Sequence, residues 1–287
     1  MIRIEIGMPQ MAANGLSENW LFRYCGDLHW QELCKSMGVR SRDLTNDAGE
    51  RLYATFVAIA ARYSKPLAHV GENDEFDAAA SIGRFGQSFF HGVAVLSNPT
   101  VELRLEMVTA FVARSRADAN ELRKSVPAAR LASNAAEMSE IPSLLKLSQA
   151  MRSDTIAQYS ILDETLDLQA GSTGLFRDCE PSPYIDFNGA NLLYFAAYPT
   201  LCDSLERMII NRSDLAVDDR DWALATSTIA RDIYYLRNAD IGVALRARLH
   251  GLHQRSGLVI LNTELLRLDD MTPIARVVTA KSFMAKP

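Results

Sequence analysis

The sequence has only four cysteines, and their placement matches neither a metal site nor a disulfide framework. No C-x-x-C pair occurs, and no cysteine lies at zinc-ligand spacing from a histidine. Isolated cysteines of this kind are typical of small buried side chains in a reducing compartment. We therefore expect a cytoplasmic protein without a metal site.

Long hydrophobic runs and basic clusters are also lacking. No segment reaches the ~18 uninterrupted apolar residues of a membrane span, and residues 1–7 lack the long apolar stretch of a signal peptide. The formal net charge of −5 argues against a nucleic-acid surface. No Walker loop, G-x-S-x-G elbow or Ser-His-Asp pattern is present. We therefore expect no membrane or nucleic-acid partner and no tightly bound cofactor.

The composition that is present suits a globular protein built from two similar halves. Hydrophobic residues make up 48% of the 287 residues, enough to bury a sizeable core. Ser17 is predicted to cap a helix that reaches Gly38, and a second helix is predicted from Gly189 to Ile210. Strands are predicted over residues 51–63, 84–97 and 101–114 in the first half, and over residues 222–235, 240–251, 256–268 and 274–284 in the second.

The two halves align with an offset near 172 residues, which an internal duplication explains economically. The alternative is two unrelated α+β segments that share a few small residues. Residues 115–180 between them are rich in alanine, leucine, serine and charges, with prolines as breaks, and are predicted to form a crossover of one or two helices. The predicted units are a first module over 1–116, a helical crossover over 117–180 and a second module over 181–287.

Several segments carry a resemblance to known proteins. Residues 184–195, with Asp186, Asn188 and Gly189, look like the helix-opening D-x-N-G motif of hot-dog thioesterases. Residues 6–10, 15–21, 26–30 and 231–240 resemble a biosynthetic family that includes the bifunctional acyltransferase/decarboxylase of leinamycin biosynthesis. The resemblance implies an α+β double hot-dog fold, in which two central helices are each wrapped by a curved antiparallel sheet. Two such modules side by side join their sheets and remove an exposed edge.

Tyr53 is the sharpest candidate that the resemblance yields. Members of that family pass an acyl group from coenzyme A to a tyrosine hydroxyl and then to a carrier-protein thiol, with decarboxylation of a malonyl- or methylmalonyl-type group. The predicted strand over 51–63 places Tyr53 at the position of that tyrosine. A phenol is a poor nucleophile at neutral pH and needs activation. The structural alternative is a strand tyrosine with a buried ring and a hydrogen-bonded hydroxyl.

The D-x-N-G segment supplies the other catalytic candidates, Asp186 and Asn188. The resemblance implies that an acid here acts as nucleophile or base and that Asn188 donates to a carbonyl or enolate oxygen. Helix capping is the competing explanation for both residues. Gly189 lets backbone approach a substrate closely, or is a simple turn glycine, and Asn191 follows it as a predicted substrate contact.

The matching region of the first module gives further binding candidates, each with a structural alternative. Gly15, Ser17 and Asn19 precede or open the first predicted helix, where Ser17 capping alone is the simpler role. Arg231 and Arg237 flank an aromatic strand and either bind a carboxylate or phosphate or pair with Asp232 and Asp240. His29 is a candidate base or a structural histidine.

Three functions remain open at this point. The first is an acyltransferase, with or without decarboxylation, that moves an acyl group from acyl-coenzyme A, its substrate, to an acyl carrier protein in polyketide-type biosynthesis. The second is a thioesterase or dehydratase on the same fold, because fold alone does not choose the reaction. The third is a non-catalytic module that binds a carrier protein. A homodimer is compatible with each of them.

Overall fold

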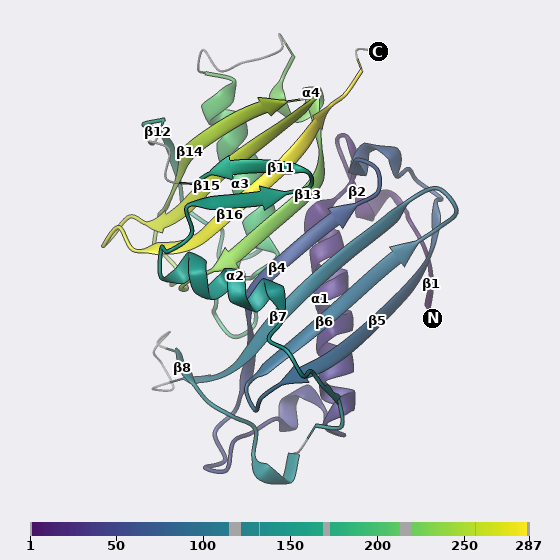
Figure 1. The fold of residues 1–287 in the computed structure, drawn as a ribbon, viewed down its shortest axis with the longest axis vertical. Coiled ribbons are helices and arrows are strands. Elements are labelled where there is room, and N and C mark those ends of the chain that lie inside the picture. The colour runs from purple at the N-terminus through teal and green to yellow at the C-terminus, as the bar shows by residue number, and fades with distance from the viewer. Residues whose placement is uncertain are drawn as a thin grey trace.

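The computed structural model describes residues 2–114, 122–131, 133–168, 173–212, 220–255 and 257–285. Within them, one 12-stranded sheet runs through the whole molecule (Figure 1). Ten of its strands follow the order β1-β5-β6-β7-β4-β13-β16-β15-β14-β12, and two short strands, β8 and β9, pair with β7 and β5 off this path. Its first half consists of β1 (Ile2–Glu5), β4 (Tyr53–Tyr63), β5 (Glu75–Phe85), β6 (Phe89–Ser97) and β7 (Glu102–Arg114). Its second half consists of β12 (Leu175–Cys179), β13 (Thr226–Tyr235), β14 (Leu245–Arg255), β15 (Leu258–Arg267) and β16 (Pro273–Phe283).

The remaining elements are helices and short strands. The helices are α1 (Glu18–Ser36), α2 (Ser143–Arg152), α3 (Ala197–Ile210) and α4 (Trp222–Ala225). The short strands are β2 (Met11–Ala12), β3 (Gly15–Leu16), β8 (Leu122–Lys124), β9 (Ala136–Glu137), β10 (Gln158–Ile161) and β11 (Glu164–Asp167). Single 3₁₀ turns are η1 (Met8–Gln10), η2 (Ser41–Asp43), η3 (Leu67–His69) and η4 (Ala129–Leu131).

The two halves meet at the antiparallel pair β4–β13, and its register shows the duplication. Ala60 pairs with Asp232, which lies 172 positions further along the chain, so the pseudo-twofold axis passes through this pair. Each strand also carries a β-bulge at an equivalent position, at Val57 in β4 and at Ile229 in β13. Bulges re-aim a strand locally. Their recurrence at the same 172-residue offset confirms the predicted internal repeat.

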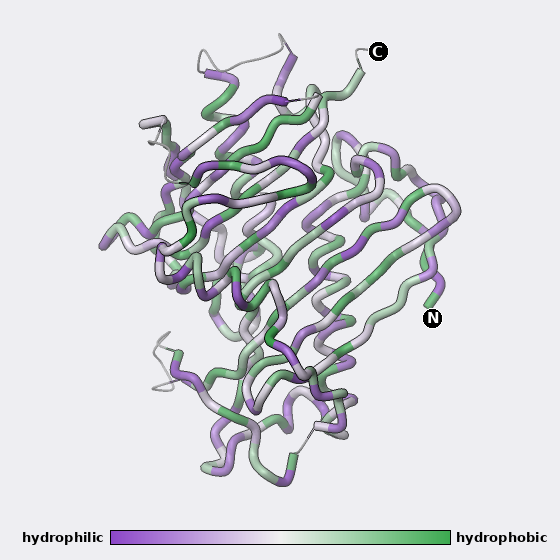
Figure 2. The backbone as a smooth tube through the Cα atoms, viewed as in Figure 1, coloured by the Kyte–Doolittle hydropathy of each residue, from purple (hydrophilic) through white to green (hydrophobic). Residues whose placement is uncertain are grey.

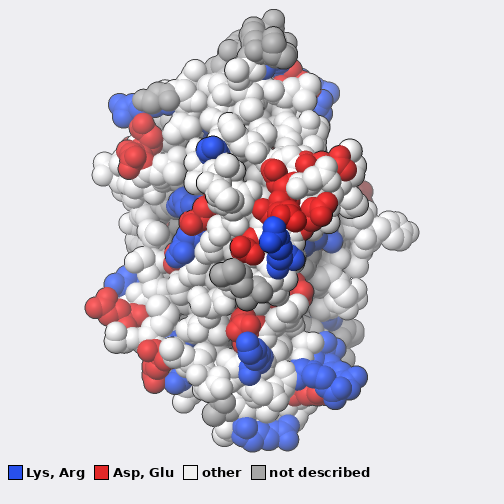
Figure 3. Space-filling view, turned by 90° about the vertical axis from the view of Figure 1, so that its right-hand side faces the viewer, with Lys and Arg blue, Asp and Glu red and all other residues white. Residues whose placement is uncertain are grey.

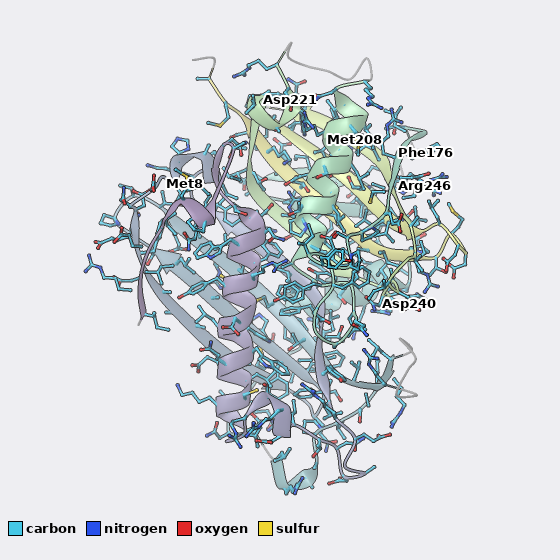
Figure 4. All side chains as sticks on the ribbon, turned by 180° about the vertical axis from the view of Figure 1, so that it is seen from behind. Met8, Phe176, Met208, Asp221, Asp240 and Arg246 are labelled. Carbon is cyan, nitrogen blue, oxygen red and sulfur yellow. The ribbon has the colours of Figure 1, made fainter. Side chains whose placement is uncertain are left out.

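The sheet is covered on both faces. α1 and α3 lie against one face, where they pack on the largest core cluster (Figures 1 and 4). On the other face, a second cluster includes α2 and the β10–β11 hairpin. Hydrophobic residues therefore follow the central strands, and hydrophilic residues are more frequent in the outer loops (Figure 2). β13 and β15 are buried almost throughout, as expected for strands covered on both sides.

Several predicted elements are confirmed. Ser17 caps α1, since its side-chain oxygen accepts a hydrogen bond from the backbone N–H of Trp20 at 3.3 Å. β4, β7, β13, β15 and β16 lie within a few residues of the predicted strands. No helix among the described residues is long and apolar enough to cross a membrane.

Other predicted boundaries are wrong. The second helix begins at Ala197 rather than at Gly189, because residues 186–194 form a turn-rich loop closed by the bridge between Phe187 and Leu193. The strand predicted over 84–97 is a hairpin, whose first strand β5 begins at Glu75. Residues 252–255, which lie between two predicted strands and are predicted to form a loop, belong to β14.

The predicted crossover is not purely helical. It contains one helix, α2, and the β10–β11 hairpin, and its last residues contribute the edge strand β12 to the second half of the sheet. Alternation of apolar Tyr159 and Ile161 with polar neighbours produces the hairpin strand. The module boundaries proposed from the sequence stay predictions.

Candidate functional site

A cleft opens where the two halves of the sheet separate. β4 and β13 pair only from Ala58 to Arg62 and from Ala230 to Tyr234. Beyond this short ladder, the first residues of β4 diverge from the end of β13, next to the bulge at Val57. The space between them is a cavity of about 930 Å³, which falls in the size range of small-molecule sites.

Both faces of the sheet contribute to this cleft. α1 and the loop before α3 line one side, with the aromatic rings of Phe56 and Phe195 in contact at a centroid distance of 3.9 Å. α2 lines the other side through Leu145, Ser148 and Arg152. Asp240, labelled in Figure 4, lies on the rim in the loop after β13. Aromatic side chains therefore line the cleft near α1, and more polar side chains of α2 line its other side.

Tyr53 lies in the wall of the cleft at the start of β4. Its strand neighbours Leu52 and Ala54 belong to the hydrophobic cluster at the end of α1. Because side chains alternate along a strand, Tyr53 faces the opposite side of the sheet, the side of α2. The guanidinium carbons of Arg51 and Arg114 lie 5.3 and 5.9 Å from the centroid of its half-buried ring. This candidate is therefore accessible from the cleft and surrounded by positive charge.

The position equivalent to Tyr53 in the second half is Ala225, 172 residues further along. Only the first half thus carries a phenol at this place. Asn188, from the loop before α3, lines the same cleft from the α1 side. The structure therefore brings Tyr53 and Asn188 to one cavity, from two halves of the chain and from opposite faces of the sheet.

Asn188 organises its own loop. Its side-chain oxygen accepts hydrogen bonds from the backbone N–H groups of Ala190 at 2.9 Å and Leu192 at 3.1 Å. The amide nitrogen is the end of this side chain that can donate to a ligand. The loop is held further by the Tyr194 N–H, which donates to the Asp186 backbone oxygen at 2.7 Å.

Asp186 does not reach the cleft. Its carboxylate accepts a hydrogen bond from the Ser182 backbone N–H at 2.7 Å and closes the turn over residues 182–186. A catalytic role for this acid therefore has no support from its position. Gly189 and Asn191 are exposed on the same loop and also lie off the cleft lining. Asn191 adopts a left-handed φ of 54°, a conformation that asparagine tolerates well.

The candidates ahead of α1 have structural contacts. Gly15 has a φ of 115°, and a Cβ there would lie 2.3 Å from the Leu67 backbone oxygen, so only glycine fits. Asn19 donates from Nδ2 to the Ala196 backbone oxygen at 2.6 Å and so ties α1 to the start of α3. With Ser17 as the α1 cap, none of the three lines the large cleft.

Arg231 is fully buried away from the large cleft. Its Nε donates to Glu18 at 2.9 Å and its Nη2 donates to Asp203 at 2.7 Å. Lys281 also donates to Asp203, at 2.7 Å. The charges of Arg231 and Lys281 overcome the effect of burial and hold the pKa of Asp203 at about 2. The predicted substrate-binding role of Arg231 is replaced by a buried ion cluster.

This ion cluster occupies the pseudo-equivalent of the large cleft. Lys281 lies 172 positions after Thr109, which lines the large cleft, and residues 226–228 likewise correspond to 54–56 of its wall. Among the described residues, the cavity at this place measures about 110 Å³ and is lined by Asp203, Lys281 and the segment before α1. The two halves therefore share a framework, but one of the two sites is filled with charged side chains.

His29 lines the large cleft from α1, but its titration does not suit a general base. Its ring is 1% exposed, and Nε2 is 2.9 Å from the Thr109 hydroxyl oxygen. Burial, together with the nearby His91, lowers the pKa of His29 to about 3. The ring is therefore neutral at physiological pH, and its weak basicity favours the structural interpretation.

The close packing of His29 gives a testable prediction at Gly92 on β6. A Cβ at Gly92 would lie 2.1 Å from Nδ1 of His29, which is itself fixed inside the molecule. We expect Gly92→Ala to lower the free energy of unfolding by about 1–3 kcal/mol through overpacking. Urea unfolding measures this cost. Gly189→Ala is the matched control, since a Cβ there meets nothing within 4 Å; equal stabilities of the two variants would contradict the packing argument.

The sequence interpretation missed the residues that α2 contributes, since Ser148, Gln149 and Arg152 line the cleft. Arg237, just after β13, is a predicted anion-binding candidate and lines the same cleft. The amphipathic pattern of residues 143–152 was a signal for a packed helix, but nothing in it showed which cavity the helix would cover.

Among the described residues, no group of His, Cys, Asp or Glu is placed to hold a metal ion. On the face shown in Figure 3, acidic and basic side chains are interspersed among uncharged areas.

A helix wrapped by a curved antiparallel sheet, twice in one chain with joined sheets, is the double hot-dog fold, and comparison with solved structures confirms it. An acyl-ACP thioesterase from Bacteroides thetaiotaomicron has a TM-score of 0.57 at 9% identity, covering 98% of this chain and 96% of its own. The 12:0-ACP thioesterase from Umbellularia californica has a TM-score of 0.62 at 11% identity, covering 99% and 93%.

A third structure, a protein from Lactobacillus plantarum described provisionally as an oleoyl thioesterase, has a TM-score of 0.69 at 10% identity, covering 99% of this chain and 96% of its own. No family model and no curated protein matches the sequence. At these identities the likeness concerns the fold. The double hot-dog prediction is thus confirmed, and the resemblance to the leinamycin-type family stays a prediction.

Proposed function

We propose that this protein acts on acyl thioesters in the large cleft and that Tyr53 accepts the acyl group. The observation that carries the proposal is the position of Tyr53, in the wall of a cavity of about 930 Å³ at the seam of the two modules. The thioesterases with the same fold act on acyl-ACP by their names, which supports thioesters as the substrate class.

The chemistry divides into two balanced steps. In the first, the Tyr53 hydroxyl oxygen attacks the thioester carbonyl, the carbon–sulfur bond breaks, and the phenolic proton goes to the leaving thiolate. In the second, an incoming thiol attacks the aryl ester and restores the phenol. Arg51 and Arg114 place positive charge beside the ring, which stabilises negative charge as it develops on the phenolic oxygen. An aryl ester is an energised donor, so transfer to a thiol is feasible.

The finer assignment follows from the sequence resemblance. By this resemblance, the acyl donor is malonyl- or methylmalonyl-coenzyme A and the acceptor is an acyl carrier protein. Loss of carbon dioxide accompanies the transfer. In that step, the carbon–carboxylate bond breaks and its electron pair forms an enolate, which takes up a proton. The side-chain oxygen of Asn188 is used by its own loop, so its amide nitrogen is the group that this cleft-lining residue can offer to the enolate oxygen.

Intact-protein mass spectrometry tests the proposal. After mixing with malonyl- or methylmalonyl-coenzyme A, we expect a covalent acyl adduct on the wild type and none on Tyr53→Phe. Carrier-protein acylation by this variant is expected to fall on the order of 10³-fold or more, as for loss of other nucleophiles. Tyr184→Phe is the matched control, because Tyr184 is 92% exposed on the loop before α3.

The adduct mass also separates the competing functions. A mass lower by one carbon dioxide shows decarboxylation. Free acid released by both the wild type and Tyr53→Phe, with no adduct, identifies a thioesterase, the second candidate that the fold relatives favour. An unmodified protein that binds carrier protein but turns over no thioester identifies a non-catalytic module. Either of the last two results would overturn Tyr53 as the acyl acceptor.

A further inference from the structure

Two arginines lie together on the α2 side of the cleft. Arg152, in the last turn of α2, donates from Nη1 to the Leu236 backbone oxygen at 2.9 Å and from Nη2 to the Tyr235 backbone oxygen at 3.0 Å. The next residue along that segment is Arg237, whose side chain also lines the cleft. α2, which belongs to neither repeat, is thereby fixed to the end of β13.

No described acidic side chain neutralises this pair. Neither Arg152 nor Arg237 has an ion pair with a carboxylate among the described residues, and the Arg237 guanidinium has no hydrogen bond there either. Two of the described acids line the cleft. Asp240 interacts with Arg267, which itself pairs with Asp270, and Asp27 accepts a hydrogen bond from Gln31. Burial and the charge of Arg237 lower the pKa of Arg152.

Both side chains keep exposed surface, so water screens their repulsion, but an anion placed between the two guanidinium groups would interact favourably with both. Arg152 uses two of the five N–H groups of its guanidinium on backbone oxygens and keeps the others. Arg237 is exposed and keeps all of its own. A guanidinium group matches the geometry of phosphate oxygens, with which it forms strong charge-assisted hydrogen bonds.

We propose that Arg152 and Arg237 bind the phosphate that terminates the pantetheine arm of the thioester substrate. This inference rests on the proposed function, since coenzyme A and acyl carrier proteins both present their thioesters on a phosphopantetheine arm. The pair holds the phosphate at the α2 rim, and the arm enters the cleft along Leu145 and Ser148, on the face to which Tyr53 points. The inserted helix α2 thus supplies one half of a binding site that the duplicated modules alone do not contain.

Isothermal titration with three ligands tests the site. Coenzyme A, phosphopantetheine and pantetheine carry the same arm with several, one and no phosphate groups. We expect Arg237→Gln to weaken binding of coenzyme A and phosphopantetheine roughly tenfold and to leave pantetheine unchanged. Arg255→Gln is the matched control, because Arg255 is 76% exposed and lies off the cleft. Arg152→Gln provides the second measurement, with its unfolding curve recorded because Arg152 also ties α2 to β13.

The three ligands distinguish the outcomes. Weaker binding of coenzyme A alone would assign the pair to the nucleotide phosphates and overturn the shared phosphopantetheine site. An equal loss for pantetheine would make Arg237 structural. This inference alone would be refuted if the wild type were acylated on Tyr53 but Arg237→Gln bound coenzyme A and phosphopantetheine as tightly as the wild type. The proposed function would be refuted if the wild type bound none of the three ligands and formed no adduct.

Discussion

Arg231→Met is expected to lower the free energy of unfolding by about 3–5 kcal/mol, because it leaves buried carboxylates without their cation. Arg231 is fully buried and bonded to Glu18 and Asp203, from the start of α1 and from α3. Methionine fills a similar volume, so the cost arises mainly from uncompensated charge. Most of this cost arises at Glu18, because its side chain is only 6% exposed and loses its cation, whereas Asp203 keeps Lys281 as a partner. Urea unfolding at neutral pH measures the loss.

A double variant separates charge from packing. Glu18→Gln combined with Arg231→Met removes the buried charge together with its partner and is expected to recover a large part of the loss. Glu18 also accepts a hydrogen bond from the Tyr63 hydroxyl at 2.9 Å, which glutamine can still accept. If Arg231→Met were as stable as the wild type, the ion cluster would contribute nothing to the free energy of unfolding.

The ion cluster also explains why the two halves differ in cavity volume. A duplicated chain with a pseudo-twofold axis through Ala60 and Asp232 has two places where a cleft can open. Buried charges occupy one of them and leave about 110 Å³. Apolar and aromatic side chains line much of the other, which keeps about 930 Å³. Where the first half has a cleft, the second half therefore has an ion cluster in which Arg231 of β13 bonds to Glu18 of α1 and Asp203 of α3.

The sequence was sufficient to predict the repeated architecture because hydrophobic pattern is duplicated with the fold. The 172-residue offset, the strand at Tyr53 and the Ser17 cap all depend on local signals of alternation and capping. The start of α3 could not be found in this way. Residues 186–194 contain enough apolar residues to resemble a helix, but the two backbone bonds accepted by the Asn188 side chain hold them in a loop.

The site was only partly predictable, for a related reason. Tyr53 and Asn188 were found, and both line the cleft. Arg231 was misjudged because its partners, Glu18 and Asp203, lie 213 and 28 residues away in sequence, and such pairing is invisible to local patterns. Arg152 and Arg237 were missed as a pair because only the packing of α2 against the end of β13 brings them together.

The free energy of unfolding is also expected to depend on pH through His29. Burial and the neighbouring His91 lower the pKa of His29 from 6.5 to about 3 in the folded chain. Between these values the unfolded state binds a proton that the folded state does not, so stability falls as the pH drops below about 6.5. Each pH unit corresponds to about 1.4 kcal/mol, which gives a loss of roughly 2 kcal/mol at pH 5 from this residue.

Urea unfolding between pH 7.5 and about 4.5 measures this slope. His29→Gln is expected to flatten it, because glutamine does not titrate and its amide can still hydrogen-bond the Thr109 hydroxyl that His29 contacts at 2.9 Å. His69→Gln, at an exposed histidine, is the matched control. Equal slopes for wild type and His29→Gln would show that His29 becomes protonated in the folded chain. In that case the ring would be basic enough for proton transfer in the cleft, and the catalytic interpretation of His29 would replace the structural one.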